Sequence, residues 1–335
     1  MKTKLILIPL LTALISLAEE SGRVTADNFR RAETDTYFAH FVKEGGFGKL
    51  CHEREMAALD KQTVIRMNRD TLYSFGVFDL DAGPVTLTLP DPGKRYLSVL
   101  LINEDHYNPD MLYAPGEFTI TRQKVGTRYV ALAVRTFANP RDPADLAAAH
   151  ALQDAIKTGQ KSAGTFESPA WDQASLTRMR QALLGVVDAG GGIDSAKMFG
   201  RKDEVDPVSH LLGTASGWGG NPRTAALYAG AVPPRNDGKA AYQLTFSKVP
   251  VDAFWSISVY NQAGFFVKND QDAYAFNSVT ATPNADGSFT IHFGGDKNAV
   301  NYLPIMPGWN YVVRMYRPQK PLLDGTWKFP EARPL

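Results

Sequence analysis

The feature that most constrains the fold is a series of short strand-like runs at both ends of the chain, broken by glycine and proline. In "PVTLTLP", Val85, Leu87 and Leu89 share one face and the threonines occupy the other, as in a half-buried strand. Residues 96–102 are almost wholly apolar, which predicts a strand covered on both faces. The 28 glycines and 21 prolines favour turns and short strands over long helices.

The middle of the chain has helical spacing instead. Asp142-Pro143 and Asp206-Pro207 each place a capping residue before a first-turn proline, and Asp172 begins another helix between them. From residue 239 strand patterns return, for example in "FWSISVY" and "DGSFTIHF". The sequence therefore predicts helices between two regions of strands.

This order of elements predicts a mainly β fold with helical connections, an α+β chain of two antiparallel jelly-roll-like β-sandwich domains. We expect an N-terminal β domain with a leading helix at residues 19–140. A helical connecting segment would follow at 141–238, and a C-terminal jelly-roll-like β domain at 239–335.

The first 18 residues have the pattern of a signal peptide. Lys2 and Lys4 form a positive end, residues 5–14 are almost wholly apolar, and residues 16–18 fit a small-x-small cleavage site. The mature chain would begin near Glu19 and be periplasmic or secreted, without a membrane span after signal cleavage. An uncleaved N-terminal anchor is the alternative.

Charge and cysteine content narrow the classes of function. The full chain has a formal charge of +1, and cleavage after residue 18 removes two lysines and no acids, which leaves −1. A near-neutral chain without basic runs is a poor binder of nucleic acid. Cys51 is the single cysteine, so it cannot form an internal disulfide, and it fits a buried small residue better than a nucleophile.

Motifs for metals and cofactors are incomplete. Gly48-Lys49 lacks the spacing of a phosphate loop, and "HEREM" has Met56 where a zinc-protease helix needs its second histidine. The six histidines show no close pair at metal spacing. We therefore expect no cofactor and no local metal motif, although distant residues could still assemble a metal site.

Two polar clusters occur in the N-terminal part. The first cluster lies on a helix that is expected over residues 27–42 with Asp27 as its cap. This cluster contains Glu33, and it is either a solvated helix face or part of a site. The other lies in "VIRMNRDTLYSFGVFDL". Read as a strand, this stretch points Arg66 and Asn68 to one side, while Asp70 would cap the next turn and pair with Arg69. It is either a hydrogen-bonded corner or a ligand site.

Two further groups stand out. Asn103-Glu104-Asp105-His106-Tyr107 follows the most apolar strand and could line the mouth of a cavity. An acid beside a histidine suits proton transfer, but adjacent strand residues face opposite ways, so Asp105 and His106 should not be partners. Trp218, in the glycine-rich loop that ends at Asn221-Pro222, presents a stacking face or packs into the core.

Several longer stretches, taken together, are distinctive. They are "NFRRAETDTYF", "VIRMNRDTLYSFGVFDL", "DEVDPVSHLLGTASGWGGNP", "VDAFWSISVYN", "DGSFTIHFGG" and "GWNYVVRMYRP…LLDGTWKFP". They resemble bacterial exported proteins that pair an N-terminal domain of unknown function 1254 with a C-terminal domain of unknown function 1214. The resemblance implies two β-rich, jelly-roll-like domains, export and a tendency to form homo-oligomers, but no reaction. Tyr302 stands at a position where these proteins more commonly have Trp or Cys.

These observations favour a protein that binds a small-molecule or carbohydrate-like ligand at the junction of the N-terminal domain and the helical segment. The expected ligand-binding residues are Arg66, Asn68, Asp70, Asp105, Trp218 and Asn221. The first alternative is a periplasmic hydrolase or lyase, with Glu33, Asp70, Tyr73 and His106 as acid–base candidates. The second alternative is a structural or assembly module of an oligomer.

Overall fold

The computed structural model describes residues 22–62, 65–190 and 194–335. In these ranges sixteen strands form four sheets, and six α-helices connect and cover them. The chain is therefore mainly β with helical connections, as the strand and helix patterns predicted. The expected signal peptide, residues 1–18, lies outside the described residues and stays a prediction.

The N-terminal strands form a two-layer sandwich. The larger layer has the order β1 (Cys51–His52), β2 (Thr71–Asp79), β7 (Tyr129–Phe137), β4 (Leu97–Asn103) and β5 (Met111–Tyr113). The smaller layer is β6 (Gly116–Ile120), β3 (Val85–Leu89) and β8 (Lys157–Gly159). Leu87, Leu101 and Leu132 are fully buried between the layers, because every second residue of these strands faces inward.

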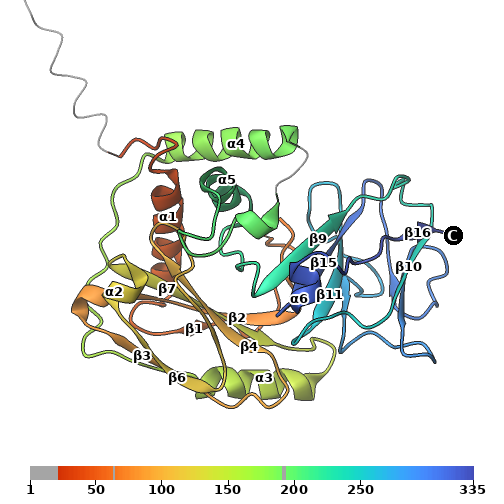
Figure 1. Ribbon diagram of the computed structural model, residues 1–335, viewed down its shortest axis with the longest axis horizontal. Coiled ribbons are helices and arrows are strands. Elements are labelled where there is room, and N and C mark those ends of the chain that lie inside the picture. Colours follow the sequence, from red (N-terminus) through yellow and green to blue (C-terminus); the bar gives the residue numbers. More distant parts are fainter. Residues whose placement is uncertain (1–21, 63–64, 191–193) are drawn as a thin grey trace, which may run out of the picture.

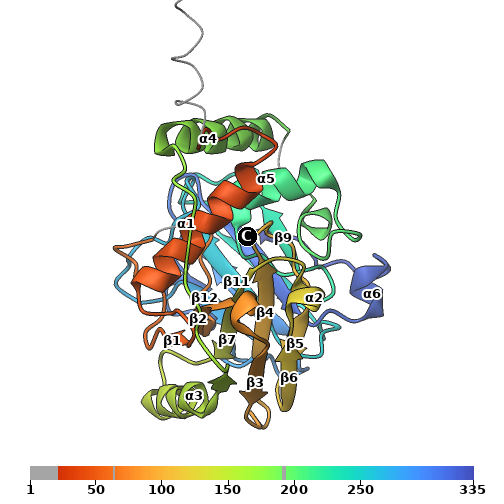
Figure 2. The same ribbon diagram turned by 90° about the vertical axis from the view of Figure 1, so that its left-hand side faces the viewer.

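Helices cover the other face of the five-stranded sheet. Helix α1 (Phe29–Lys43) packs Phe38 and Phe41 against Val77 and Leu100, and α4 (Gln173–Ala189) and α5 (Pro207–Gly217) pack on α1 (Figure 2). Helix α3 (Pro143–Ala155) lies at the opposite end of this domain, and α2 (Arg122–Val125) is a single turn (Figure 1). Strand β4 is thus buried along its whole length, as its apolar sequence predicted.

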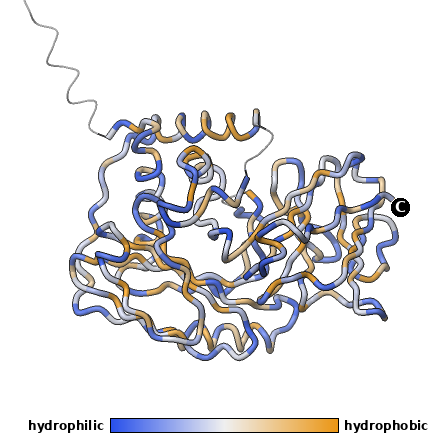
Figure 3. The backbone as a smooth tube through the Cα atoms, in the orientation of Figure 1, coloured by the Kyte–Doolittle hydropathy of each residue, from blue (hydrophilic) through white to orange (hydrophobic). Residues whose placement is uncertain are grey.

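The C-terminal strands form a second sandwich. One layer is β12 (Ala275–Asn277), β11 (Trp255–Tyr260), β15 (Asn310–Tyr316) and β9 (Ala226–Ala231). The other is β14 (Tyr302–Leu303), β13 (Phe289–Phe293), β10 (Tyr242–Phe246) and β16 (Arg333–Pro334), and α6 (Lys320–Leu323) follows β15. Trp309, Tyr242 and Phe293 lie in its core. Hydrophobic residues run along the strands of both sandwiches (Figure 3).

The first residues of four helices can be compared with the predicted N-caps. The side chains of Asp142, Asp172 and Asp206 each accept backbone N–H bonds at the start of α3, α4 and α5, so these three predictions are confirmed. The prediction for the first helix is wrong. Its N-cap is Asn28, without a side-chain cap bond, and Asp27 lies one residue outside.

Two other expectations need correction. Arg66 does not lie on a strand: it sits in a turn with φ of 53°, and β2 begins only at Thr71. The segment 141–238 is not only helical, because it contains β8, which pairs with β3, and β9, which pairs with β15. Each sandwich therefore draws a strand from the connecting segment. None of the helices in the described ranges combines the length and hydropathy needed to cross a membrane.

Candidate functional site

A polar row crosses the five-stranded sheet where α1 no longer covers it. Tyr73 on β2 and Ser98 on β4 are both direct cross-strand neighbours of Arg135 on β7. Directly opposed residues in antiparallel strands point to the same face, so these three side chains form one row. This face is the one that carries Ala133 and Leu100 beneath α1.

A second polar row crosses the C-terminal sheet. Ser256 on β11 is opposed by Asn277 on β12 and by Arg314 on β15, and Arg314 is opposed by Tyr228 on β9. The inward-facing partners Trp255 and Ile257 alternate with these residues and pack in the core of the C-terminal sandwich. The second row therefore faces away from that core.

The two rows meet at the junction of the sandwiches, where residues 66–70 run between them. Asn277 Nδ2 donates to Asp70 Oδ1 at 3.0 Å, and Asn68 Nδ2 donates to the Tyr316 hydroxyl at 3.1 Å. Arg314 Nη2 donates to the carbonyl of Arg66 at 2.6 Å. We call the resulting group the interdomain polar cluster; it comprises Asn68, Asp70, Tyr73, Tyr96, Ser98, Arg135, Asn221, Tyr228, Ser256, Asn277, Arg314 and Tyr316.

Arg135 is the least satisfied charge in the interdomain polar cluster. Its side chain is only 7% exposed, and its guanidinium lies 5.6 Å from the centre of the Tyr73 ring. Nη2 donates to the Gly219 carbonyl at 2.8 Å, but Nη1 has no partner among the described residues. The titratable groups that act on its charge are phenols, including those of Tyr96, Tyr228 and Tyr316. A guanidinium stays charged in a protein, so this is a buried cation with an open donor.

Other buried atoms of the cluster also have no partner within the described ranges. They are the hydroxyls of Tyr96, Ser98 and Ser256, the side-chain carbonyl of Asn221, and Oδ2 of Asp70. The Tyr96 and Ser98 hydroxyls lie close enough to interact with each other, and so do Asp70 and Ser256. A buried polar atom without a hydrogen bond costs about 1–3 kcal/mol. Native structures satisfy such atoms, so a group of them at one place indicates bound water or a bound ligand.

The second arginine of the cluster is fully engaged. Arg314 donates to Ser258 Oγ at 3.0 Å, to the Tyr260 hydroxyl at 2.7 Å and to the Arg66 carbonyl. Asp70 lies nearby and is 1% exposed; burial raises its pKa, and the hydrogen bonds of Asn277 and Ser256 and the charge of Arg314 oppose that rise. Arg314 therefore fixes residues 66–70 to the C-terminal sheet, whereas Arg135 remains available.

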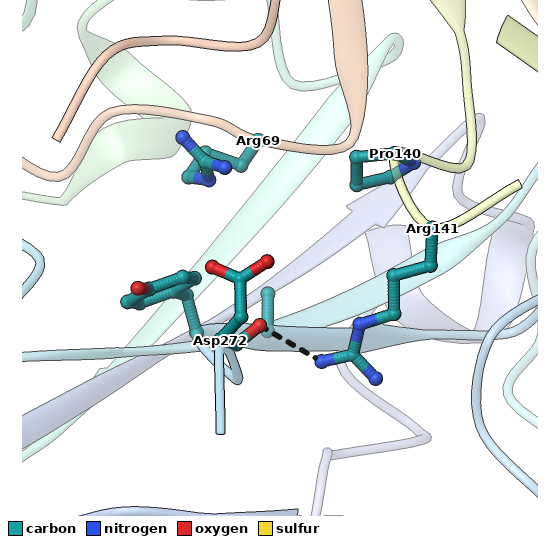
Figure 4. Close-up of a pocket in the computed structure, with 6 residues that line it drawn as sticks. Arg69, Pro140, Arg141 and Asp272 are labelled. Atoms are coloured by element: carbon teal, nitrogen blue, oxygen red, sulfur yellow. Dashed lines mark hydrogen bonds between the residues drawn. The ribbon is translucent and has the colours of Figure 1, made fainter. Parts of the chain in front are cut away.

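A surface pocket lies at the same junction (Figure 4). Arg141 Nη2 donates to the Asp272 carbonyl at 3.1 Å across the pocket, and Arg69 stacks on Tyr274 at 5.3 Å. Its lining residues are Arg69, Pro140, Arg141, Asp272, Tyr274 and Ala275. Two of these residues, Arg69 and Ala275, lie one and two positions from Asp70 and Asn277, which hydrogen-bond to each other. The pocket therefore lies beside the interdomain polar cluster, towards the protein surface.

The expected site residues separate into two groups. Asn68, Asp70, Tyr73 and Asn221 lie in the interdomain polar cluster. Arg66 is exposed and contributes its backbone carbonyl to Arg314. Asp70 caps no turn and does not pair with Arg69, which donates to the carbonyl of Ala57. The Asp70 backbone N–H is instead bound by Asn68 Oδ1 at 2.7 Å.

The remaining expected residues make contacts that hold α1 and α5 to neighbouring elements. Asp105 pairs with Arg31 at 2.7 Å, a contact that the sequence did not predict. It does not pair with His106, in agreement with the prediction. Glu33 is buried and pairs with Arg180 at 2.6 Å, so this helix face is not solvated.

The aromatic groups beside α5 are occupied by contacts within the protein. His106 Nε2 accepts the Gly219 N–H at 2.9 Å, so Nδ1 carries the proton and donates to Thr214 Oγ1. Burial lowers the pKa of His106 well below its usual value. The Trp218 ring stacks on Tyr37 with centroids 4.1 Å apart, and its Nε1 donates to Thr34. Gly219, whose N–H binds His106, gives its carbonyl to Arg135, so one residue links His106 to the interdomain polar cluster.

Sequence reasoning missed both arginines and three tyrosines of the interdomain polar cluster: Arg135, Arg314, Tyr96, Tyr228 and Tyr316. A usable signal was present, because "YVALAVRTF" and "NYVVRMY" each place one charge in an otherwise apolar run. Both strands are buried along their whole length. A charge in such a strand needs a specific partner.

No group of three or more His, Cys, Asp or Glu side chains within the described ranges could hold a metal ion. Arginine, amide, hydroxyl and phenol groups dominate the interdomain polar cluster instead. These groups suit hydrogen bonding to a polar or anionic molecule.

Sequence models of two protein families match this chain. "Protein of unknown function (DUF1254)" matches residues 47–160, and "Protein of unknown function (DUF1214)" matches residues 228–320. The chain carries a DUF1254 domain followed by a DUF1214 domain. The DUF1254 domain supplies the row with Arg135, and the DUF1214 domain supplies the row with Arg314. The order of the two domains confirms the resemblance noted in the sequence.

Solved structures share this fold. The VPA0106 protein from Vibrio parahaemolyticus aligns with a TM-score of 0.68 at 18% identity, over 92% of this chain and 97% of that one. An uncharacterised protein from Burkholderia cenocepacia aligns with a TM-score of 0.54 at 14% identity, over 92% of this chain and 87% of that one. No curated protein sequence matches the chain significantly.

Proposed function

We propose that this DUF1254–DUF1214 protein binds a small polar ligand with a negatively charged group between its two domains. The observation that carries the proposal is the Arg135 guanidinium, which is 7% exposed and has Nη1 without a partner in the described part of the chain. A buried cation without an anionic partner is costly, and an anionic oxygen of a ligand would pair with it. Asn221 Oδ1 has no partner in the same ranges, and Tyr96 and Ser98 bring two hydroxyls that can bond each other or a ligand.

The first experiment compares the native mass of the mature chain, residues 19–335, with its denatured mass. A stoichiometric extra mass would reveal a retained ligand. Calorimetric titration with small carboxylates and with phosphate then measures binding directly. Absence of both a retained mass and any binding would refute the proposal.

Substitution of Arg135 locates the binding. In Arg135→Gln we expect the affinity for the anion to fall by about 10-fold to 150-fold, because a hydrogen bond to a charged group contributes about 1.5–3 kcal/mol. Arg128→Gln is the matched control, since Arg128 precedes the same strand and pairs with Asp79 at 2.9 Å, away from the cluster. Equal affinities of Arg135→Gln and Arg128→Gln would contradict the assignment.

A hydrolase or lyase that acts on the same ligand is the second candidate. Asp70 favours it, because this acid is buried, lies beside the Ser256 hydroxyl, and has a raised pKa caused by burial. Tyr73 lies in the same cluster. Conversion of a bound acid, followed by NMR over hours, would support this candidate, and an unchanged spectrum would count against it.

We also propose that the protein is exported to the periplasm or secreted. The support is the charged, apolar and small-residue pattern of residues 1–18. N-terminal sequencing of protein recovered from a periplasmic fraction should begin near Glu19. An N-terminus at Met1 would contradict cleavage.

A further inference from the structure

The surface pocket beside the interdomain polar cluster brings together three charged side chains that do not pair. Arg69 and Arg141 lie on different sides of this pocket, and the Asp272 carboxylate points into the space between them (Figure 4). No ion pair within the described ranges includes any of these three residues. Two cations therefore face a space that holds a single acid, which leaves an excess of one positive charge.

Both arginines are held in place and keep donors to spare. Arg69 donates from Nη1 to the Ala57 carbonyl and lies over the Tyr274 ring at 5.3 Å. Arg141 donates from Nη2 to the Asp272 carbonyl at 3.1 Å and lies over the Phe276 ring at 5.6 Å. Each guanidinium has five N–H donors, so most of them stay available. Guanidinium groups fixed in this way suit an oxyanion, which can accept two parallel hydrogen bonds from one arginine.

Asp272 adds a hydrogen-bond acceptor to the same space. It lies in a turn with φ of 47°, where its N–H donates to the Asn269 carbonyl at 3.2 Å and its own carbonyl accepts from Arg141. These contacts fix the direction of the carboxylate. The Tyr274 phenol is close enough to interact with this carboxylate, but the two carboxylate oxygens can accept about four hydrogen bonds in all. Asp272 can therefore also accept from a ligand.

The size and charge of the pocket narrow the class of ligand. The open space measures about 40 Å³. One water molecule needs about 10–15 Å³ by this measure, so the pocket has room for a small ion. An anion without a proton would be attracted by the two arginines and repelled by Asp272. Hydrogen phosphate avoids this conflict, because it carries both charged oxygens and a P–OH group that donates to a carboxylate.

We propose that this pocket binds hydrogen phosphate, with Arg69 and Arg141 donating to its charged oxygens and Asp272 accepting from its P–OH group. The site is separate from the one under Proposed function, because none of these three residues belongs to the interdomain polar cluster. It therefore does not depend on Arg135.

The test is calorimetric titration of the mature chain, residues 19–335, with phosphate and with sulfate at pH 8 and equal ionic strength. The two ions carry nearly the same charge at this pH, so electrostatic attraction alone would not separate them. Sulfate has no proton to donate. We expect phosphate to bind about tenfold or more tightly than sulfate, since its P–OH group reaches a charged acceptor.

A phosphate monoester distinguishes the free ion from a phosphate group on a larger molecule. Glycerol 3-phosphate has lost its last proton at pH 8, because the second pKa of a phosphate monoester is about 6. It should therefore bind as weakly as sulfate.

Variants assign the binding to this pocket. Asp272→Asn removes the repulsion and keeps the turn, since asparagine tolerates positive φ. In this variant the affinity for sulfate should rise and the preference for phosphate should fall towards equality. Arg141→Gln should weaken both ions about tenfold. Arg122→Gln is the matched control, because it removes another surface arginine, which pairs with Asp81 at 3.0 Å, and it should change neither affinity. Circular dichroism checks that each variant folds.

The outcomes separate this inference from the proposed function. Absence of phosphate binding, equal affinities for phosphate and sulfate, or tighter binding of glycerol 3-phosphate would overturn the inference. So would a preference for phosphate that survives in Asp272→Asn. Phosphate binding that is lost in Arg135→Gln but kept in Arg141→Gln would place the ion in the interdomain polar cluster, which overturns this inference and supports the proposed function.

Discussion

Asp35 on α1 should make the stability of this protein depend on pH between 4 and 7. Its side chain is 5% exposed, and Oδ2 accepts from Trp171 Nε1 at 2.8 Å. Burial raises its pKa from 3.8 to about 6; the Trp171 bond and Arg31 oppose the rise, and Glu104 and Asp105 add to it. The ionised carboxylate is therefore less stable in the folded chain than in the unfolded chain.

The size of the effect follows from the two pKa values. A rise from 3.8 to about 6 corresponds to roughly 3 kcal/mol of unfolding free energy. Because the folded pKa is raised, this stability is fully present below pH 3.8 and is lost as the pH rises through about 6. Asp35→Asn removes the titration and keeps an oxygen that accepts from Trp171. The variant should match wild type near pH 4 and be more stable by up to about 3 kcal/mol near pH 7.5.

Urea unfolding at a series of pH values measures this difference. Asp145→Asn is a control of opposite sign, because the hydrogen bond from Arg95 lowers the pKa of Asp145, so its stabilisation is present above pH 3.8 and is lost as the pH falls. That variant should lose more stability near pH 7.5 than near pH 3.5. A difference between Asp35→Asn and wild type that stays constant from pH 4 to 7.5 would refute the reasoning.

Two further substitutions test contacts that hold the helices in place. Glu33→Gln breaks the ion pair between a buried carboxylate and Arg180 and should lower the unfolding free energy, measured in urea, by about 2 kcal/mol. Glu167→Gln is the control and should cost less, because the carboxylate of Glu167 is exposed where it pairs with Arg128. Asp142→Ala removes the N-cap of α3 and should lower the unfolding free energy by about 1 kcal/mol, seen as a lower melting temperature. Asp142→Asn should keep most of the stability, because asparagine also caps helices. Equal melting temperatures of the two variants would contradict a capping role.

Local patterns were enough to predict much of the fold. The alternation in Val85, Leu87 and Leu89 appears as three buried residues of β3. Capping by Asp172 depends on residues within one turn, so it is readable from sequence. The turn at Arg66 was missed because its left-handed backbone is fixed by contacts with Gly264 and Arg314, which are distant in the chain.

The candidate site was predicted only in part. Asn68, Asp70 and Asn221 stood out because they are polar residues beside apolar runs. Arg135 and Arg314 did not, since each is a single charge inside a strand whose partners come from other strands and from loops.

The sequence by itself determined most of the strands and helices, where three of the helices begin, and that two β-rich domains follow one another. Those properties depend on neighbours within a few residues. The tertiary structure alone decided which polar side chains meet. Asp70 and Asn277 are 207 residues apart, and Asn68 and Tyr316 are 248 residues apart. Such hydrogen bonds exist only once the two sandwiches have docked, and the docking buries Arg135 with one donor left open.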